Sequence, residues 1–474
     1  MKVILAGFNV DIDILKQLDP NGEALLTPET FSAAYARISR SSKSVSELRR
    51  EACKDVEKAR KSNKTIIFEM GHHSVAEHAV FNFDIMGISR LCLEEVEKFR
   101  LVSYTEKSQR YVTLENDYVI PKEFTNSKIV NLFKKTIDKQ FSFYKLAFEK
   151  LKEYHSSFPG NSNQRKIENL AKEDARYILP LAMQGQVGVT INARNLEHLF
   201  RRFKMSKYEE VKELGKKIYQ LVKPISPSII LFDEPSPFEK NLYADLQNKF
   251  NHIIVSEVSR LDDFKIISFT KNADDIILAA LLSSLKGITF DSSSQIIKKL
   301  DKNKKADLYK TMFAQMQFFD VPPREFELVD VTFQAVISAS NFAQLKRHRM
   351  ATLLSSNYDI ALGNTIPQSI IDIHLDKEFM SLIDQTNDIY NEIKKNYEHA
   401  ANYILTNSHR RVVIMKMNLR EIYHFARLRA DINAQWDIRA LAKKLINEVR
   451  RISPLASQLL CGKSDLPDAP PSIY

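Results

Sequence analysis

The two halves of this chain repeat one another, and this repeat restricts the possible folds more than any other feature of the sequence. Four polar residues recur at identical spacing. In the first half they are Asn192, Arg194, His198 and Arg201, and in the second half Asn418, Arg420, His424 and Arg427. Later in each half, Ile225-Ser226-Pro227 is echoed by Ile452-Ser453-Pro454. Because chance similarity between amphipathic helices would not give four polar identities in one short window, we predict a tandem duplication.

A proline-rich stretch separates the two copies. It runs from Pro224 to about Tyr243 and contains four prolines, a density that predicts a linker in place of a continuous helix. A chain of 474 residues is long enough for two domains. We therefore expect a first copy at residues 1–240 and a second copy at residues 241–474.

Periodicity predicts a mixture of helices and strands. Apolar residues at helical spacing mark one stripe between Ile129 and Tyr144 and another between Phe379 and Tyr397. Partial alternation predicts strands at 79–85 and 329–336, and the first residues of the chain also resemble a strand. Two further short strands, at 188–191 and 412–417, each run directly into a helix. The fold class is therefore α+β.

Composition excludes several classes of protein. No apolar run is long enough for a transmembrane helix, and three widely spaced cysteines argue against a disulfide framework. We expect a cytoplasmic protein with no membrane partner. The formal net charge of +10 favours anionic partners such as nucleotides, nucleic acid or anionic lipid, although it also suits a solubilising surface. Because no basic tail is present, nucleic acid is the least expected of these.

The predicted helix from Asn418 to Arg429 carries a stripe of cationic side chains. Asn418 and Arg429 are 11 residues apart, about three turns, and therefore share a face. Arg420, His424 and Arg427 form an adjacent stripe. Such donors suit a phosphate or the edge of a uracil ring, but a solvated cationic face has the same pattern.

A second basic cluster lies at Gln344-Leu-Lys-Arg347-His348-Arg349. A helix would align Gln344, Arg347 and His348, because they are related by three and four residues. A basic surface helix is the alternative. The apolar residues on both sides of the cluster make full exposure less comfortable.

The first half offers two polar clusters. The spacing of His72, His73, Glu77 and His78 matches no zinc motif, so we expect hydrogen bonding near a ligand and no metal site. Glu106, Ser108 and Arg110 combine the groups that clamp a sugar and phosphate, although a polar turn before a strand at 111–114 would look similar. Since no glycine-rich phosphate loop is present, side chains would have to hold a nucleotide or flavin.

Together these motifs resemble the flavin-dependent thymidylate synthases. That family carries H-x-S-x-x-E-H before a strand, then R-H-R, E-x-S-x-R-Y, L-P, N-x-R-x-x-x-H and A-Q-W-E-I-R. The matching segments here are 72–78, 106–111, 176–180, 192–198, 347–349, 418–429 and 434–439. The resemblance covers nearly the whole chain, once per half. It implies two tandem copies of a fold with helices around a mostly antiparallel sheet.

Each copy has lost what the other retains. In the first copy, R-H-R has become Lys98-Phe99-Arg100, the glutamine before it is Glu95, and the late arginine is Phe203. In the second copy, E-x-S-x-R-Y has become the segment 355–360, and the arginine before L-P is Asn402. In the family, neighbouring subunits share each nucleotide site and contribute these two sets. Because random decay would not divide the losses in this way, we infer one retained and one abandoned site per chain.

The resemblance implies reductive methylation of dUMP to dTMP, with methylenetetrahydrofolate as carbon donor, FAD as hydride carrier and NADPH as reductant. It implies Arg429 as the catalytic residue. The substrate-binding residues would be Gln344, Arg347, Glu106, Ser108, Arg110 and Arg176. The FAD-binding candidates are Ser39, His72, Ser74, Arg347, His348, Arg349, Asn192, Arg194, His198, Asn418, Arg420 and His424. Since the family is tetrameric, a chain with two copies should form a pseudo-tetrameric homodimer.

Two other functions stay open. The chain could act on another one-carbon unit, another pyrimidine or uridine in RNA. It could also bind a nucleotide or flavin without catalysis, since Lys98, Phe99 and Thr105 depart from the family pattern.

Overall fold

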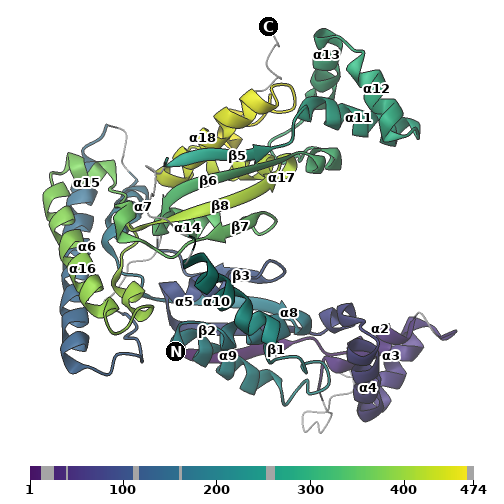
Figure 1. Ribbon diagram of the computed structural model, residues 1–474, viewed down its shortest axis with the longest axis horizontal. Helices are drawn as coiled ribbons and strands as arrows, with labels where there is room; N and C mark the ends of the chain where they lie inside the picture. The colour runs from purple at the N-terminus through teal and green to yellow at the C-terminus, as the bar shows by residue number, and fades with distance from the viewer. Residues whose placement is uncertain are drawn as a thin grey trace. The chain divides into compact units, whose positions relative to one another are not determined.

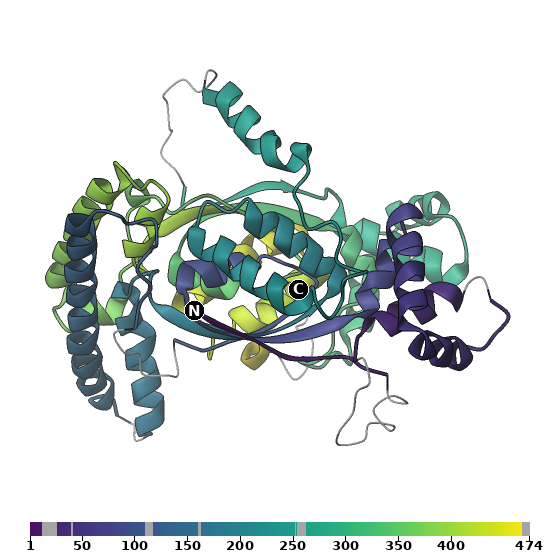
Figure 2. The same ribbon diagram turned by 90° about the horizontal axis from the view of Figure 1, so that it is seen from below.

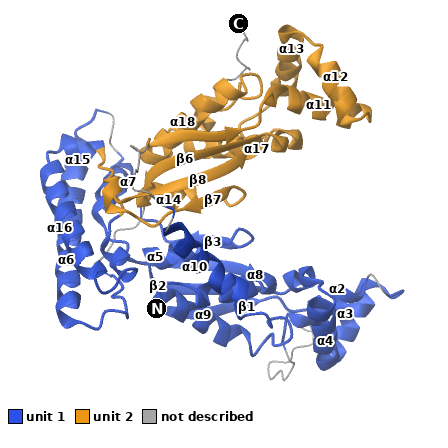
Figure 3. Ribbon diagram, in the orientation of Figure 1, with its two compact units in different colours: residues 1–257, 368–406 blue, residues 258–367, 407–474 orange. Residues whose placement is uncertain are grey.

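A computed structural model describes residues 1–11, 26–38, 41–109, 117–159, 163–251, 253 and 262–466. The chain divides into two compact units (Figure 3). Unit 1 comprises Met1–Glu257 and Gln368–Thr406, and unit 2 comprises Val258–Pro367 and Asn407–Tyr474. Each unit contains one four-stranded antiparallel sheet. This arrangement confirms the α+β fold class.

The sheet of unit 1 has the strand order β1-β2-β4-β3. Its strands are β1 (Lys2–Phe8), β2 (Val80–Ser89), β3 (Ser103–Glu106) and β4 (Gln184–Asn192). Alternate residues of β2, such as Phe81 and Phe83, are buried in the core, as the partial alternation predicted. The strands predicted at the start of the chain, at 79–85 and at 188–191 are confirmed.

Helices of unit 1 lie before, between and after these strands. The N-terminal group is α2 (Glu29–Arg37), α3 (Val45–Lys54), α4 (Val56–Asn63), the π-helix η2 (Lys64–Glu69) and the 3-10 helix η3 (His73–His78). The short α5 (Arg90–Val96) follows β2, and α8 (Ala193–Lys204) and α9 (Glu209–Val222) follow β4. Phe200, Leu214 and Ile218 from α8 and α9 complete the core against the sheet.

A helical layer in unit 1 combines segments from both sequence copies. The first copy contributes α6 (Ser127–Ser156), α7 (Gln164–Ala175) and η4 (Arg176–Ile178), and the second contributes α15 (Gln368–Asp372), α16 (Asp376–Lys394) and η7 (Ala400–Ile404). Figures 1 and 2 show α6 and α16 side by side. Their predicted apolar stripes face each other, with the ring centroids of Phe143 and Phe379 5.7 Å apart. Both predicted helices are therefore confirmed.

Unit 2 repeats the strand order of unit 1, as β5-β6-β8-β7. Its strands are β5 (Phe264–Phe269), β6 (Asp330–Ser338), β7 (Thr352–Ser355) and β8 (Arg410–Asn418). Its helices are α11 (Ala273–Lys286), α12 (Phe290–Lys298), α13 (Lys302–Phe313), η5 (Arg324–Leu328), α14 (Ala339–Leu345), η6 (Ile360–Leu362), α17 (Leu419–Arg429), α18 (Trp436–Ile452) and η8 (Lys463–Asp465). The strands predicted at 329–336 and 412–417 are confirmed.

The linker prediction was partly wrong. Helix α10 spans Pro237–Asn251 and begins inside the proline-rich stretch. Proline is compatible with the first turn of a helix because its missing N–H would have no helical partner there. The predicted boundary after residue 240 therefore falls within a helix. The compact units also differ from the predicted sequence copies, because residues 368–406 belong to unit 1.

Candidate active site

Helix α17 begins where β8 ends, because Asn418 caps it. The Asn418 side-chain oxygen accepts a hydrogen bond from the Glu421 backbone N–H at 2.8 Å. Arg429 is the last residue of the helix, as predicted. Asn192 caps α8 of unit 1 in the same way, with its side-chain oxygen 2.9 Å from the Asn195 backbone nitrogen. The repeated Asn is therefore a helix cap in both copies.

Arg429 and His348 form a hydrogen-bonded pair in unit 2. The Nε–H of Arg429 donates to Nε2 of His348 at 3.0 Å, and Nη2 of Arg429 donates to the Gln344 backbone oxygen at 3.3 Å. Nδ1 of His348 lies 3.5 Å from Oε1 of Glu421. The His348 ring packs against Phe425, with centroids 4.8 Å apart. The structure thus brings together Gln344, His348 and Arg429.

His348 is buried, with 4% of its surface exposed. Burial lowers the pKa of its imidazole, and the nearby Arg429 and His424 lower it further, while Glu421 opposes them. The ring is therefore neutral at pH 7. Because an arginine N–H can only donate, Nε2 of His348 has to be the unprotonated acceptor and Nδ1 carries the proton.

The prediction that one helix aligns Gln344, Arg347 and His348 was wrong. Helix α14 ends at Leu345, and the three residues Arg347–Arg349 lie in a turn, where the His348 backbone N–H donates to the Leu345 oxygen at 3.1 Å. The chain has to reverse here because β7 begins at Thr352 and pairs with β8. This turn, in place of a further helical turn, directs His348 towards α17.

Two residues of the A-Q-W-D segment support this cluster, although the sequence had not assigned them a role. Oε1 of Gln435 accepts a hydrogen bond from Nε2 of Gln344 at 3.3 Å. The Asp437 carboxylate accepts from the Ser338 hydroxyl at 2.6 Å and from the Asn341 amide at 2.8 Å, which ties α18 to the start of α14. Glu421 was also missed, because no motif marks it. Only its place one turn before His424 could have suggested a role.

The repeated Arg of each copy pairs with a glutamate. In unit 2, Nη1 of Arg420 lies 3.2 Å from Oε1 of Glu327, and its Nε donates to the Pro322 oxygen at 2.8 Å. In unit 1, Arg194 forms the equivalent pair with Glu77. Both arginine side chains stay partly exposed. The glutamate of the H-x-S-x-x-E-H motif is therefore an ion-pair partner, consistent with the predicted hydrogen-bonding cluster.

Several of the remaining residues predicted to bind flavin have exposed or partly exposed side chains. His72 and Ser74 are exposed at the start of η3, and His424 is exposed on α17. His198 receives a 2.7 Å contact at Nδ1 from Nη2 of Arg201, and burial together with the neighbouring arginines lowers its pKa. Ser39 and Arg110 lie outside the described residues, as does the strand predicted at 111–114.

Buried charged side chains occur among the substrate-binding residues predicted in the first copy. Nη1 of Arg90 donates to Oε1 of Glu106 at 2.7 Å, and both side chains are almost completely buried. Arg176 is also buried, and its Nε donates to the Glu173 backbone oxygen at 3.2 Å. The Arg90–Glu106 pair fixes the end of β3, two residues before Ser108. In the second copy Ala339 and Ser355 replace this pair.

Phe99 and Phe203 take the places of His348 and Arg429 in the first copy. Both phenylalanines are buried, and their ring centroids lie 6.0 Å apart. A hydrogen-bonded polar pair in one unit therefore corresponds to an aromatic pair in the other. The two positions have changed together, so that the first copy has hydrophobic core where the second has polar groups.

In the second copy, Arg411 packs against the segment that replaces E-x-S-x-R-Y. Arg411 stacks between Phe342 and Tyr358, with its guanidinium carbon 4.5 Å and 4.2 Å from the two ring centroids. Its Nε also donates to the Ser356 oxygen at 2.8 Å. The strand registers place Gly185 at the corresponding position of the first copy. An arginine plug thus occupies the region of the lost E-x-S-x-R-Y motif.

The two copies meet in unit 1 at another pair of altered motif positions. The side-chain amide of Asn402 donates to the Tyr208 hydroxyl at 3.1 Å, and the Tyr403 hydroxyl donates to Glu210 at 2.8 Å. Asn402 occupies the position of Arg176, and Tyr208 that of Gln435. The segment before L-P of one copy therefore contacts the start of the last helix of the other copy.

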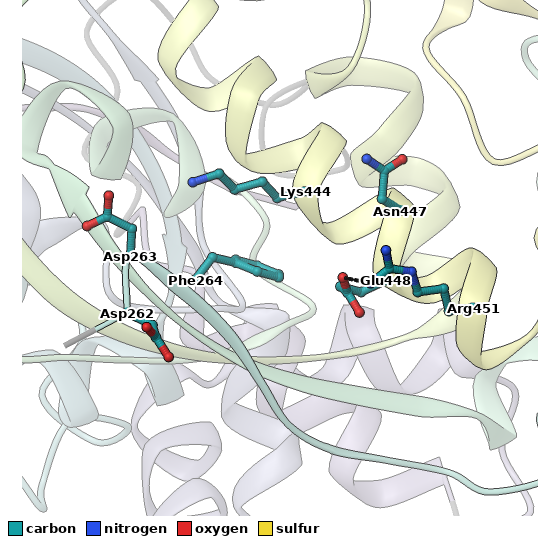
Figure 4. Close-up of a pocket in the computed structure, with 7 residues that line it drawn as sticks. All are labelled: Asp262, Asp263, Phe264, Lys444, Asn447, Glu448 and Arg451. Atoms are coloured by element: carbon teal, nitrogen blue, oxygen red, sulfur yellow. Dashed lines mark hydrogen bonds and ion pairs between the residues drawn. The ribbon is translucent and has the colours of Figure 1, made fainter. Parts of the chain in front are cut away.

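One surface hollow of about 400 Å³ lies in unit 2 between β5 and α18 (Figure 4). It is lined by Asp262, Asp263, Phe264, Lys444, Asn447, Glu448 and Arg451. None of the predicted site residues lines it. Among the described residues, no group of three or more histidine, cysteine or acidic side chains is arranged to hold a metal ion, and no helix is long and apolar enough to cross a membrane.

Comparison with known proteins extends over most of the chain. The family described as "Thymidylate synthase complementing protein" matches twice, at residues 23–228 and 265–455. The UPF0159 protein Ta1429 of Thermoplasma acidophilum is 22% identical over 82% of this chain and 86% of its own length. The flavin-dependent thymidylate synthase of Geobacter sulfurreducens is 31% identical over 43% of this chain and 80% of its own length.

A solved structure of a UMP/dUMP methylase PolB from Streptomyces cacaoi, bound with 5-Br dUMP, also matches. It is 14% identical and covers 41% of this chain and 92% of its own, with a TM-score of 0.33. The two family matches cover the greater part of the sequence and confirm the resemblance seen in the motifs. This chain therefore belongs to the thymidylate synthase complementing protein family.

Proposed function

We propose that this chain is a flavin-dependent thymidylate synthase, which converts dUMP to dTMP with methylenetetrahydrofolate, FAD and NADPH. The observation that carries the proposal is the complementary state of the two copies. The second copy keeps the hydrogen-bonded pair His348–Arg429, where the first has Phe99–Phe203. The first copy keeps the buried pair Arg90–Glu106, which the second lacks. Decay without selection would not preserve opposite pairs.

The donor set fits a flavin nucleotide that side chains hold. Arg194 and Arg420 each use part of the guanidinium on a glutamate and expose part of it, which leaves donors suited to phosphate or ring oxygens. His72, Ser74 and His424 add exposed polar groups. With Arg347 and Arg349, these residues would hold FAD, which supplies the hydride chemistry when bound. His348 is buried between Arg429 and Glu421 and would act by holding Arg429 in place.

Arg429 is the residue that we assign to catalysis. His348 and the Gln344 oxygen hold its guanidinium through Nε and Nη2, so that its orientation is set before substrate binds. A preoriented cation stabilises negative charge that develops on the uracil ring as C6 accepts hydride. Gln344 and Arg347 would contact the base, and Ser108, Arg110 and Arg176 the sugar and phosphate.

The arrangement of Asn402 against Tyr208 supports a site composed of both copies. In unit 1, the segment before L-P of the second copy contacts the first copy at altered motif positions. We propose that the productive site uses the two retained sets: Glu106, Ser108, Arg110 and Arg176 from the first copy, and Gln344, Arg347 and Arg429 from the second. We also expect two chains to associate, which light scattering would test.

Growth of a thymidylate-deficient host without thymidine tests the proposal directly. The wild-type chain should support growth, whereas Arg429→Ala and Arg110→Ala should not, because each removes a charged contact worth roughly 1.5–3 kcal/mol. Asp359→Ala, at the abandoned counterpart of Arg110, is the matched control and should grow. The proposal of dUMP methylation would be wrong if the soluble wild-type chain did not support growth and a substrate screen found turnover of a different pyrimidine. The chain would then catalyse a related reaction.

Mixing Arg110→Ala with Arg429→Ala tests how the retained sets combine. Recovered turnover in the mixture means that sets from different chains complete one site. No recovery, with each single variant inactive, means that one chain supplies both sets. Full activity of either single variant contradicts the composite site.

A further inference from the structure

Glu421 completes a chain of three side chains in unit 2. Its carboxylate lies 3.5 Å from Nδ1 of His348, and Nε2 of the same ring accepts from Nε of Arg429 at 3.0 Å. Glu421 and Arg429 both belong to α17, eight residues apart, and His348 comes from the turn after α14. The histidine ring thus lies between the first and last turns of α17. Its Nε2 is hydrogen-bonded to Arg429, whereas Nδ1 has no hydrogen-bond partner among the described residues and faces the Glu421 carboxylate at ion-pair distance.

The carboxylate has a definite chemical effect in this position. A neutral imidazole has one N–H and one acceptor nitrogen, and its surroundings decide which nitrogen carries the proton. Glu421 can only accept while ionised, so it favours the proton on Nδ1 of His348. Nε2 is then left as the acceptor that the Arg429 N–H requires. With the opposite tautomer, two N–H groups would face each other at 3.0 Å.

The groups around the His348 ring are consistent with a proton on Nδ1. From α17, His348 faces Glu421, His424, Phe425 and Arg429. Glu421 is the anionic member of that set, and the ring is almost completely buried. Burial and the neighbouring cation keep the ring neutral, so that its tautomer, and not its charge, determines the hydrogen bond to Arg429.

The first copy of the chain lacks all three side chains of this arrangement. The positions of Glu421, His348 and Arg429 are Asn195, Phe99 and Phe203 in the first copy, so all three have changed. The neighbouring positions Asn418, Arg420 and His424 are identical in both copies. Asn195 donates its side-chain amide to Asn192 and takes no part in the Phe99–Phe203 contact. Glu421 is therefore present in the copy that has the His348–Arg429 pair and absent from the copy that lacks it.

We propose that Glu421 is a positioning residue, which fixes the tautomer of His348 and thereby the orientation of the Arg429 guanidinium. This role rests on the proposed function, because Arg429 acts on the uracil ring only in that reaction. Glu421 itself has no contact with the substrate in this scheme. A carboxylate that orients a histidine serves the same purpose in other enzymes, where replacement by an amide leaves the geometry intact but favours the wrong tautomer.

Glu421→Gln is the sharpest test, because it keeps the size of the side chain and removes its charge. The amide can donate to Nδ1 of His348 and would move the ring proton to Nε2. We expect kcat to fall on the order of 10- to 100-fold, the range found when residues that orient metal ligands in other enzymes are replaced. KM for dUMP should change much less. Glu448→Gln, which removes the charge of the partly exposed carboxylate that pairs with Arg451 on α18, is the matched control and should keep wild-type kcat.

Nitrogen NMR of labelled histidine gives a readout that does not depend on turnover. The resonances of His348, assigned by their loss in His348→Gln, should show a protonated Nδ1 in the wild type and a protonated Nε2 in Glu421→Gln. A protonated Nε2 in the wild type would overturn the proposal, as would a Glu421→Gln variant with wild-type tautomer and kcat. If the protein lacks thymidylate synthase activity altogether, the tautomers still decide whether Glu421 orients His348.

Discussion

Phe203→Ala should show that the first copy has turned its part of the abandoned site into hydrophobic core. Phe203 is 1% exposed on α8 and packs against Phe99. It also lies against Gly215, where an added Cβ would come within 3.0 Å of the Phe203 Cβ. Truncating a buried phenylalanine to alanine costs about 3–5 kcal/mol. Of this, the ring contact with Phe99 accounts for about 0.5–1.5 kcal/mol, which a cycle with Phe99→Ala would isolate.

In the second copy, Arg429→Ala should have the opposite effect, a small loss of stability and a large loss of turnover. It removes one hydrogen bond to His348 and one to the Gln344 oxygen, and Arg429 is only partly buried. We expect a loss of about 1–2 kcal/mol in stability, mainly from the unpaired acceptor on His348, together with near-complete loss of turnover. Phe203→Ala should keep most of its turnover per folded molecule.

Native-state hydrogen exchange with mass spectrometry can measure both effects locally. Peptides from α8 and α9 should lose 3–5 kcal/mol of protection in Phe203→Ala, while peptides from α17 and α18 should change little. A loss of less than about 1 kcal/mol in Phe203→Ala would show that Phe203 is not part of the hydrophobic core. A loss of stability in Arg429→Ala as large as that in Phe203→Ala would contradict the expected difference between the two copies.

Three further predictions follow from the same contacts. Purified protein should be yellow and hold FAD non-covalently. A colourless protein that cannot be reconstituted with FAD would show that the chain does not bind flavin. Because the pKa of His348 is lowered in the folded state, the unfolded chain takes up a proton below about pH 6.5 that unit 2 does not. The unfolding free energy should therefore fall by up to about 1.4 kcal/mol per pH unit below that value, until the folded pKa is reached. Urea titrations at a series of pH values would give the unfolding free energy of the wild type and of His348→Gln, and its dependence on pH should be weaker in His348→Gln. An equal pH dependence in the two proteins would show that His348 is not the group involved. Arg411→Ala should destabilise unit 2 by about 1–2 kcal/mol through the loss of its stacking on Phe342 and Tyr358, measured by the fluorescence of Trp436 in α18. An unchanged midpoint would show that the plug contributes nothing.

The sequence predicted the elements whose periodicity is strong. The apolar stripes that begin at Ile129 and Phe379 lie on α6 and α16, and the alternating residues at 79–85 lie in β2. The fold class followed because these elements recur in both copies. The end of α14 was missed, because the turn before β7 is a requirement of strand pairing and leaves no mark in helical spacing. The start of α10 was missed because Pro237 looks like a helix breaker but occupies the first helical position.

Contacts between distant residues could not be predicted from spacing alone. His348 and Arg429 were both selected as candidates, but their hydrogen bond across 81 positions required the fold. Phe99 and Phe203 were noted as two separate losses, and their packing shows that they form one replacement. The inclusion of residues 368–406 in unit 1 depends on the packing of α16 against α6, which no motif records.

The number of dUMP molecules bound per chain distinguishes one retained site from two working sites. Isothermal titration of the FAD-loaded protein with dUMP would measure it. We predict about one dUMP per chain, although each chain contains two copies of the fold, because Phe99–Phe203 and the Arg411 plug fill the positions that we propose to be abandoned. Two dUMP molecules per chain, bound with equal affinity, would contradict it.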